Sequence, residues 1–450
     1  MERRVRWIIL LVLGGSAIAG CEALGSGDEA SELDQALEAR LAEAAPGGDL
    51  GFFRLPAGAD LASIPQDPRN PLSPAKVELG RLLFHEPALL SAPKRPQGRS
   101  TASCASCHHA RAGFQAGRRQ GIGEGGMGFG VRGEARTRDP AYGLGDLDVQ
   151  PIRSPSAMNA AYQSVMLWNG QFGALGPNAG TEAAWTAGTP KETNRLGYEG
   201  LETQAIAALG VHRLEGADST LATRYPRYGE LFAAAFPGQP IDRERAGLAI
   251  AAYERTLLAD RAPFQRWLRG ERGALSDAQK RGALVFFGRG RCATCHTGPA
   301  LSSMAFYALG MGDLRGPDVF LDGGNELARP EHLGRGGFTG RSEEMYAFKV
   351  PQLYNLADVG SLGHGATFPT VRAVIEYKNR AQAETGLVPS ERLAEGFVPL
   401  GLTDEEIADL ARFLEEALYD PELERYVPVA LPSGACFPVN DPQGKADLGC

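Results

Sequence analysis

The sequence predicts a mainly α-helical protein of two similar domains with long irregular connections. Stretches such as 276–287 and 403–418 carry apolar residues at helical spacing. The 450 residues include 58 glycines and 30 prolines, which favour long loops. A short phrase of cysteine and histidine, TASCASCHH at 101–109, returns as CATCH at 292–296. These observations indicate a duplicated helical unit rather than one continuous domain.

A predicted helix leads into each copy of the phrase. Ser276 is the expected N-cap of the helix before the second copy. The stretch ELGRLLFHEPALLS at 78–91 gives the first copy a matching approach. Thr403 and Glu406 form a capping box that starts a final amphipathic helix. The second unit therefore begins and ends with a well-marked helix.

The first 20 residues have the pattern of a signal peptide. A basic start precedes an apolar run at 7–13 that is too short to cross a membrane. The following small residues end at Cys21, which resembles a bacterial lipobox; an ordinary cleavage site with an incidental cysteine is the alternative. We expect a periplasmic or cell-envelope protein that lipid on Cys21 anchors to a membrane. Residues 21–75 then form a tether and N-terminal extension, with one exposed helix.

The net charge of -8 bears on the partners of the protein. An acidic chain is not attracted to the phosphates of nucleic acid, so nucleic acid is not an expected partner. The same charge favours a basic protein partner.

Two of the seven cysteines stand apart in the C-terminal tail, 421–450. In an exported protein the environment is oxidising, so Cys436 and Cys450 are expected to form a disulfide that closes this tail. Two free thiols are the alternative.

The spacing CxxCH is that of covalent haem c attachment. Both thiols add to vinyl groups of a haem, and the next histidine ligates the iron. Zinc would require four ligands at one place, and a redox dithiol has no need of the histidine in both copies. His109 follows the ligand directly and is expected to be solvated or to lie behind it. The sequence therefore predicts two covalent haem c groups, held by Cys104, Cys107 and His108, and by Cys292, Cys295 and His296.

Six ordered blocks resemble the bacterial di-haem cytochrome c peroxidase family, which includes the maturase of the methylamine dehydrogenase quinone cofactor. The similarity runs from about residue 79 to residue 418, most of the chain. The blocks are LGRLLFHEPALLS, RSPSAMNAAY at 153–162, LWNG at 167–170, LETQA at 201–205, the stretch 275–302, and the stretch 348–377.

The resemblance implies two cytochrome c-like haem domains, at 76–272 and 273–420. The first haem would react with hydrogen peroxide, and the second would receive electrons from a small donor protein, a cytochrome c or a cupredoxin. His108 and His296 would be the iron ligands. Trp168 matches a tryptophan between the haems; a core aromatic residue is the alternative reading.

The catalytic residues that the resemblance implies are only partly present. Gln204 matches the family's glutamine, but the glutamate expected ten residues later falls on a leucine. Glu215 is one substitute. We favour His212 as the base and Arg213 as the charge stabiliser, since both tasks must be met for peroxide chemistry. An exposed polar turn, or an impaired site, is the alternative.

Three further departures surround the first haem. Residues from about 171 to 200 are inserted beside the site and could restrict substrates. The loop 110–138 lacks the histidine that ligates the resting iron in many relatives, so we expect a flexible loop and a haem open to peroxide, with Met127 as a substitute ligand otherwise. Arg153 stands where the family has a calcium-binding asparagine, which argues against calcium.

The sixth ligand of the second haem is open at this point. Lys378 falls at the family's ligand position, and it shares a helical face with Val371 and Val374. Tyr377 and Met345 are alternatives, as are an open site and a lysine that reaches solvent.

The sequence thus favours a peroxidase that reduces hydrogen peroxide. A maturase-like oxidase acting on a protein or organic substrate through Trp168 is one alternative. A di-haem electron carrier without turnover is another, from a different functional class.

Overall fold

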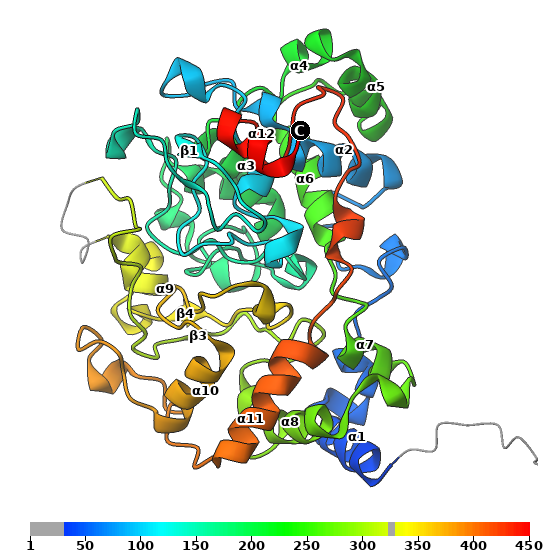
Figure 1. Cartoon of the computed structure of the whole chain (residues 1–450), viewed down its shortest axis with the longest axis vertical. Helices are drawn as coiled ribbons and strands as arrows, with labels where there is room; N and C mark the ends of the chain where they lie inside the picture. The colour runs from blue at the N-terminus through cyan, green and yellow to red at the C-terminus, as the bar shows by residue number, and fades with distance from the viewer. Residues whose placement is uncertain (1–30, 323–328) are drawn as a thin grey trace, which may run out of the picture.

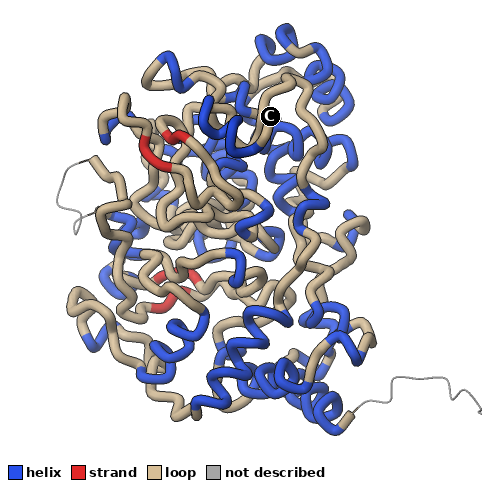
Figure 2. Tube along the Cα trace, in the orientation of Figure 1, coloured by secondary structure: helices blue, strands red, loops and turns tan. Residues whose placement is uncertain are grey.

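The computed structural model describes residues 31–322 and 329–450. It is a mainly helical molecule in which long loops outnumber the strands (Figure 2). The helices are α1 (Glu32–Ala44), α2 (Pro74–His85), α3 (Gly200–Val211), α4 (Ser219–Arg224), α5 (Pro226–Ala235), α6 (Arg243–Arg255), α7 (Pro263–Leu268), α8 (Asp277–Phe287), α9 (Gly334–Thr339), α10 (Val371–Arg380), α11 (Asp404–Arg412) and α12 (Pro442–Leu448). Two antiparallel pairs of short strands complete it: β1 (Gly126–Met127) with β2 (Thr137–Arg138), and β3 (Phe306–Tyr307) with β4 (Phe348–Lys349).

The helices form two groups, one above the other in Figure 1. The upper group contains α2 to α6, and the lower group contains α8, α10 and α11. Each group is built around one close helix crossing. A Cβ on Gly80 of α2 would lie 1.9 Å from the carbonyl oxygen of Ala249 in α6, and one on Gly282 of α8 would lie 2.0 Å from that of Asp409 in α11. Only glycine permits these approaches, and the repeated crossing supports the predicted duplication.

The predicted caps of the second group are confirmed. Ser276 and Gln279 form a capping box at the start of α8, and Thr403 and Glu406 form one at the start of α11. The buried aromatic rings of Phe286 and Phe413 then pack with centroids 5.4 Å apart.

The expectation of an exposed helix in the N-terminal extension is wrong. Leu37 and Leu41 of α1 are fully buried, and α1 lies against α8 at the bottom of the molecule (Figure 1). The buried carboxylate of Asp34 accepts a 2.7 Å hydrogen bond from Trp267 Nε1 and pairs with Lys280 at 2.8 Å. These contacts join the extension to the second domain. The predicted signal peptide and Cys21 lie outside the described residues.

The C-terminal tail returns from α11 to the upper domain, where α12 lies beside β1 (Figure 1). A disulfide joins Cys436 and Cys450, as predicted. Asp447 of α12 accepts hydrogen bonds from the backbone amides of Phe129 and Gly130, at 2.7 and 3.2 Å. The tail therefore fastens the glycine-rich loop near the first cysteine–histidine phrase.

That loop is well packed, so the prediction of a flexible loop is wrong. The buried guanidinium of Arg136 donates to the carbonyls of Ile122, Gly123 and Gly128, at 2.6, 2.8 and 3.1 Å. It also pairs with the carboxylate of Asp441 at 3.1 Å. The Arg136 guanidinium thus connects three turns of the loop through hydrogen bonds and connects the loop to the tail through an ion pair.

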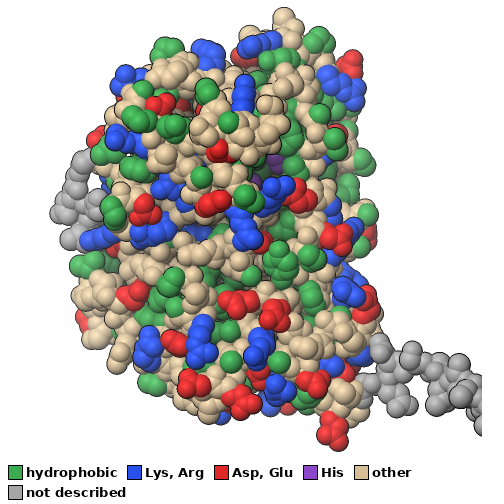
Figure 3. Space-filling view, in the orientation of Figure 1, with side chains coloured by type: hydrophobic (Ala, Val, Ile, Leu, Met, Phe, Trp, Pro, Cys, Tyr) green, Lys and Arg blue, Asp and Glu red, His purple; other side chains and the backbone are tan. Residues whose placement is uncertain are grey.

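Charged side chains of both signs are interspersed over the face seen in Figure 3. Within the two described ranges, helices long and apolar enough to span a membrane are absent.

Asp441→Asn should lower the free energy of unfolding by about 3–5 kcal/mol, because it leaves the Arg136 guanidinium buried without a counter-charge. The Arg136–Asp441 side chains are 1% and 6% exposed. Glu230→Gln is the control: the Arg227–Glu230 pair is 64% and 66% exposed, so its loss should cost less than about 1 kcal/mol. Denaturant titration of the two haem-loaded variants measures both, and equal effects would contradict this account.

Candidate functional site

The first cysteine–histidine phrase forms a tight turn after α2. Residues Cys104–Ser106 make one 3-10 turn, and the ring of His108 follows it. Nδ1 of His108 lies 3.2 Å from the carbonyl oxygen of Phe114, to which it donates. Burial lowers the pKa of His108 to about 4, so the ring is neutral at physiological pH. This bond leaves Nε2 as the nitrogen available to a metal.

The second phrase repeats this construction. Cys292–Thr294 form the turn, and Nδ1 of His296 is 3.1 Å from the carbonyl oxygens of both Leu301 and Pro351. Burial lowers the pKa of His296 to about 4 as well. Both histidines are therefore held as neutral rings by backbone carbonyls, an arrangement typical of metal-ligating imidazoles.

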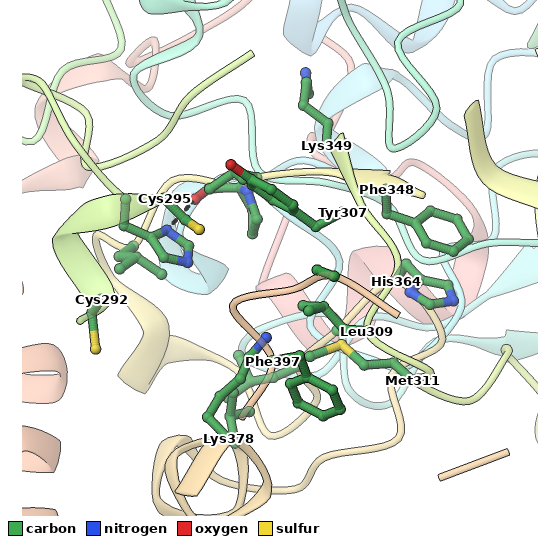
Figure 4. A pocket seen from close by; sticks show the side chains of 18 of the residues that line it. Cys292, Cys295, Tyr307, Leu309, Met311, Phe348, Lys349, His364, Lys378 and Phe397 are labelled. Carbon is green, nitrogen blue, oxygen red and sulfur yellow. Dashed lines mark hydrogen bonds between the residues drawn. The ribbon is translucent and has the colours of Figure 1, made fainter. Parts of the chain in front are cut away.

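A cavity of about 700 Å³ opens beside the second turn. Cys292, Cys295 and His296 line it together with apolar side chains from α8, α10 and α11 (Figure 4). Its size and lining suit a large planar ligand such as a haem.

The cysteines of the two phrases are free thiols. Burial raises the pKa of Cys107 and of Cys292 to about 12. Across the described ranges, the structure brings together no group of three or more histidine, cysteine, aspartate or glutamate side chains that could hold a metal ion.

A histidine–aspartate pair lies near the first turn. Nδ1 of His212, at the end of α3, is 2.9 and 3.0 Å from the two carboxylate oxygens of Asp148. Burial alone would lower the pKa of His212, but the Asp148 carboxylate outweighs burial and raises it above its usual value. Burial is the largest influence that lowers the His108 pKa. A charge on His212 lowers it further, because it disfavours protonation of His108. The two rings are thus electrostatically coupled, and Nε2 of His212 is left to exchange protons.

Arg213 and Glu215 lie differently from His212. The Arg213 guanidinium pairs with the buried carboxylate of Glu124 and donates to the carbonyl of Asp146 at 2.9 Å. It therefore supports the loop that carries Asp148, and it is not oriented as the charge stabiliser that the sequence suggested. Glu215 is exposed to solvent, unlike a residue of a closed site. The sequence reading missed Asp148 and Glu124 because they are distant in the chain.

The other two predicted catalytic residues occupy different positions. Gln204 is half-buried on α3, eight residues before His212. Trp168 is buried between the two groups of helices, where its Nε1 donates to the carbonyl of Arg153 at 2.8 Å. Its own carbonyl accepts the amide of Lys349 at 2.8 Å, and its ring lies 6.2 Å from that of His364. Trp168 therefore links the first domain to the second.

His109 is buried, so the prediction that it is solvated is wrong. Its ring lies 4.9 Å from Phe129 of the glycine-rich loop, and burial lowers its pKa to about 3. It packs behind the first site, the other position the sequence allowed. Met127, the substitute ligand considered above, lies in β1 beside α12.

The inserted residues pack against the second domain. Arg335 of α9 is buried and donates to the side chain of Asn178 at 2.7 Å and to the carbonyl of Pro177 at 2.6 Å. Trp185 is also buried. The insert at 171–200 is therefore a fixed bridge between domains.

The second cavity distinguishes the candidate sixth ligands. Val371, Val374 and Lys378 line it, which confirms their shared helical face. The Tyr377 hydroxyl instead donates to the carbonyl of Leu309, and Tyr377 does not line the cavity.

Two methionines complete the comparison of ligands. Met345 packs against Gly336 of α9, outside the cavity. Met311, which the sequence reading missed, has its sulfur in the same cavity as the Lys378 amine (Figure 4). Burial lowers the pKa of Lys378 to about 8.

Comparison with known proteins agrees with this geometry. Residues 74–273 match the family model described as di-haem cytochrome c peroxidase. The chain is 28% identical over 422 residues to the methylamine utilization protein MauG of Methylorubrum extorquens, covering 93% of this chain and 95% of that one. It is 26% identical over 325 residues to cytochrome c551 peroxidase of Pseudomonas aeruginosa, covering 72% and 77%.

The fold is also found in a solved structure, a MauG-like protein associated with microbial copper homeostasis. That structure has a TM-score of 0.57 and 24% identity, and the match covers 86% of this chain and 98% of that one. With two cysteine–histidine turns of one construction, the chain is similar to the di-haem cytochrome c peroxidase family, whose model matches residues 74–273.

Proposed function

We propose that this protein reduces hydrogen peroxide to water with electrons from a small redox protein. The balanced reaction consumes one peroxide, two protons and two electrons, and it gives two waters. The observation that carries the proposal is the His212–Asp148 pair, which couples electrostatically to His108 of the first turn. That pair supplies the proton exchange that cleavage of an O–O bond requires.

The residues divide the work as follows. His108 and His296 would hold the two haem irons, and the bound haems would supply the redox chemistry. Nε2 of His212 would accept a proton from the peroxide and return it to the departing oxygen. Asp148 orients the ring, while Gln204 contributes a fixed dipole to the charge that develops. Arg213 positions the Asp148 loop through the carbonyl of Asp146.

The second domain delivers electrons. A small donor, a cytochrome c or a cupredoxin, would supply the electrons through a haem held by Cys292, Cys295 and His296, and Trp168 would lie on the route between the domains. The reaction needs two such transfers for each peroxide.

Attachment and location follow from the sequence. The four thiols would add to haem vinyl groups, which suits cysteines that form no disulfide. Export to the periplasm or cell envelope, with a lipid anchor on Cys21, provides the compartment in which the Cys436–Cys450 disulfide forms.

Two other functions compete. The 28% identity to a methylamine utilization protein favours a maturase-like oxidase, which would draw electrons from a protein or organic substrate through the buried Trp168. The exposed position of Glu215 leaves the first site without the family's glutamate, which favours a non-catalytic electron carrier.

Steady-state peroxide consumption with reduced cytochrome c, and separately with a reduced cupredoxin, tests the proposed function. Catalytic oxidation of either donor, at two donors per peroxide, is expected. Peroxide consumption that no donor supports would favour the oxidase, and an absence of any reaction with peroxide would favour the electron carrier.

His212→Gln should slow the reaction of the first haem with peroxide by about 10²–10⁴-fold, because the proton acceptor is lost. Rapid-mixing absorbance at fixed peroxide measures the rate. Glu215→Gln is the matched control on the same turn and should leave the rate unchanged. If Glu215→Gln is the slow variant, Glu215 is the base and the assignment to His212 is wrong.

Asp148→Asn should move the pH dependence of the peroxide reaction to lower pH. A base must be neutral to accept a proton, so the rate rises as pH passes through the His212 pKa, which Asp148 raises above 6.5. Without the carboxylate that pKa falls, and the rising limb moves with it. A pH–rate profile that is identical in the wild-type protein and Asp148→Asn would show that His212 is not the base in the reaction.

We propose Lys378 as the sixth ligand of the second haem. Its side chain lines the cavity together with His296, and its amine lies 5.5 Å from the centre of the Phe397 ring and interacts electrostatically with His296. Lys378→Ala should convert the second haem from a six-coordinate to a five-coordinate absorbance and electron-spin resonance signature. Tyr377→Phe, one residue away, should not. An unchanged signature in Lys378→Ala, with a changed one in Met311→Ala, would assign Met311 instead.

A further inference from the structure

One buried cation between the domains has no anion beside it. Arg153 is 3% exposed, and burial lowers its pKa only to about 10, so it stays charged at physiological pH. Nη1 donates to the side-chain oxygen of Gln115 at 2.5 Å. Among the described residues, Nε and Nη2 have no hydrogen-bond partner. A buried charge with two idle donors is costly, which indicates that a ligand completes it.

The backbone of Arg153 fixes where that side chain lies. Its amide donates to the carbonyl of His364 in the second domain at 2.9 Å, and its carbonyl accepts Nε1 of Trp168 at 2.8 Å. Arg153 lines the cavity of the second haem site together with Trp168 and His364. The guanidinium is therefore held at the inner wall of that cavity, away from solvent.

The two idle nitrogens define the shape of the missing partner. Nε and Nη2 form one edge of the guanidinium, whose two parallel N–H bonds match the two oxygens of a carboxylate. The acidic residues that line the cavity are Asp313 and Glu395, and neither is hydrogen-bonded to Arg153. The nearby buried Lys349 differs, because its amine donates to Gln163 and to the carbonyl of Val165, and it points away from the cavity cysteines (Figure 4).

We propose that the Nε–Nη2 edge of Arg153 binds a propionate carboxylate of the second haem. This inference rests on the proposed function only in so far as a haem c occupies the cavity. Haem c carries two propionates, and one of them satisfies both idle donors and neutralises the buried charge. Arg153 then acts as a positioning residue that sets the second haem against Trp168 through its own carbonyl. The fixed guanidinium also takes the place that the family resemblance gives to a calcium ion.

Resonance Raman spectra of the haem-loaded protein test the contact directly, because the propionate bending modes respond to hydrogen bonding at the carboxylate. Arg153→Gln should shift these modes and lower the midpoint potential of the second haem, since loss of a nearby positive charge favours the oxidised iron. Arg153→Lys should restore most of the potential but not the modes, because an ammonium lacks the two-pronged edge. Arg291→Gln removes an exposed arginine from the same cavity and should change neither.

Unshifted modes in Arg153→Gln, with haem content and circular dichroism intact, would overturn the proposal. A shift confined to the first haem would overturn the assignment to the second. If Arg153→Gln does not fold, a chelation experiment on the wild-type protein still tests the proposal. Chelation of divalent cations should leave modes and potentials unchanged, and a shift that Ca²⁺ reverses would show that a metal, not Arg153, is the cation there. Peroxide reactivity is measured separately. If the wild-type protein does not react with peroxide but Arg153→Gln shows the predicted shifts, the proposed peroxidase function is rejected and this contact is retained.

Discussion

The backbone carbonyls that hold the two proximal histidines are the constraint on which the rest of the structure depends. Phe114 holds Nδ1 of His108, and Leu301 with Pro351 holds Nδ1 of His296. Each bond fixes a tautomer and leaves Nε2 as the nitrogen available to a metal, and burial keeps both rings neutral.

The two sites share the cysteine–histidine turn with a carbonyl-bonded histidine, but the side chains near each turn differ. The first faces a histidine whose proton exchange Asp148 tunes, whereas the second faces an amine and a thioether in an apolar cavity. In the function proposed above, proton chemistry is assigned to the first domain and electron entry to the second. Between them, Trp168 donates to the carbonyl of Arg153 and accepts the amide of Lys349, so directional contacts join the two domains in addition to a hydrophobic core that they share.

The parts of the fold that are local in sequence were the predictable ones. The capping boxes of α8 and α11 and the cavity-facing stripe of α10 follow from residues a few positions apart, and the disulfide joins cysteines only 14 positions apart. Long-range contacts were not predictable. Asp34 reaches Trp267 and Lys280 and so buries a helix that looked exposed. Likewise, a loop rich in glycine looked flexible because the carboxylates that anchor it, those of Asp441 and Asp447, lie about 300 residues away in the tail. The family resemblance placed His212 and Arg213 together at the first site, whereas the fold gives them different partners, Asp148 for His212 and Glu124 for Arg213.

The central claim is that the first haem is open to peroxide as the oxidised protein stands, with His212 ready to move the proton. Stopped-flow mixing of the fully oxidised, haem-loaded protein with one equivalent of hydrogen peroxide tests it most directly. The account predicts a rapid change in the haem absorbance that reduced cytochrome c reverses. An absorbance that stays constant until the protein has first been reduced would contradict it.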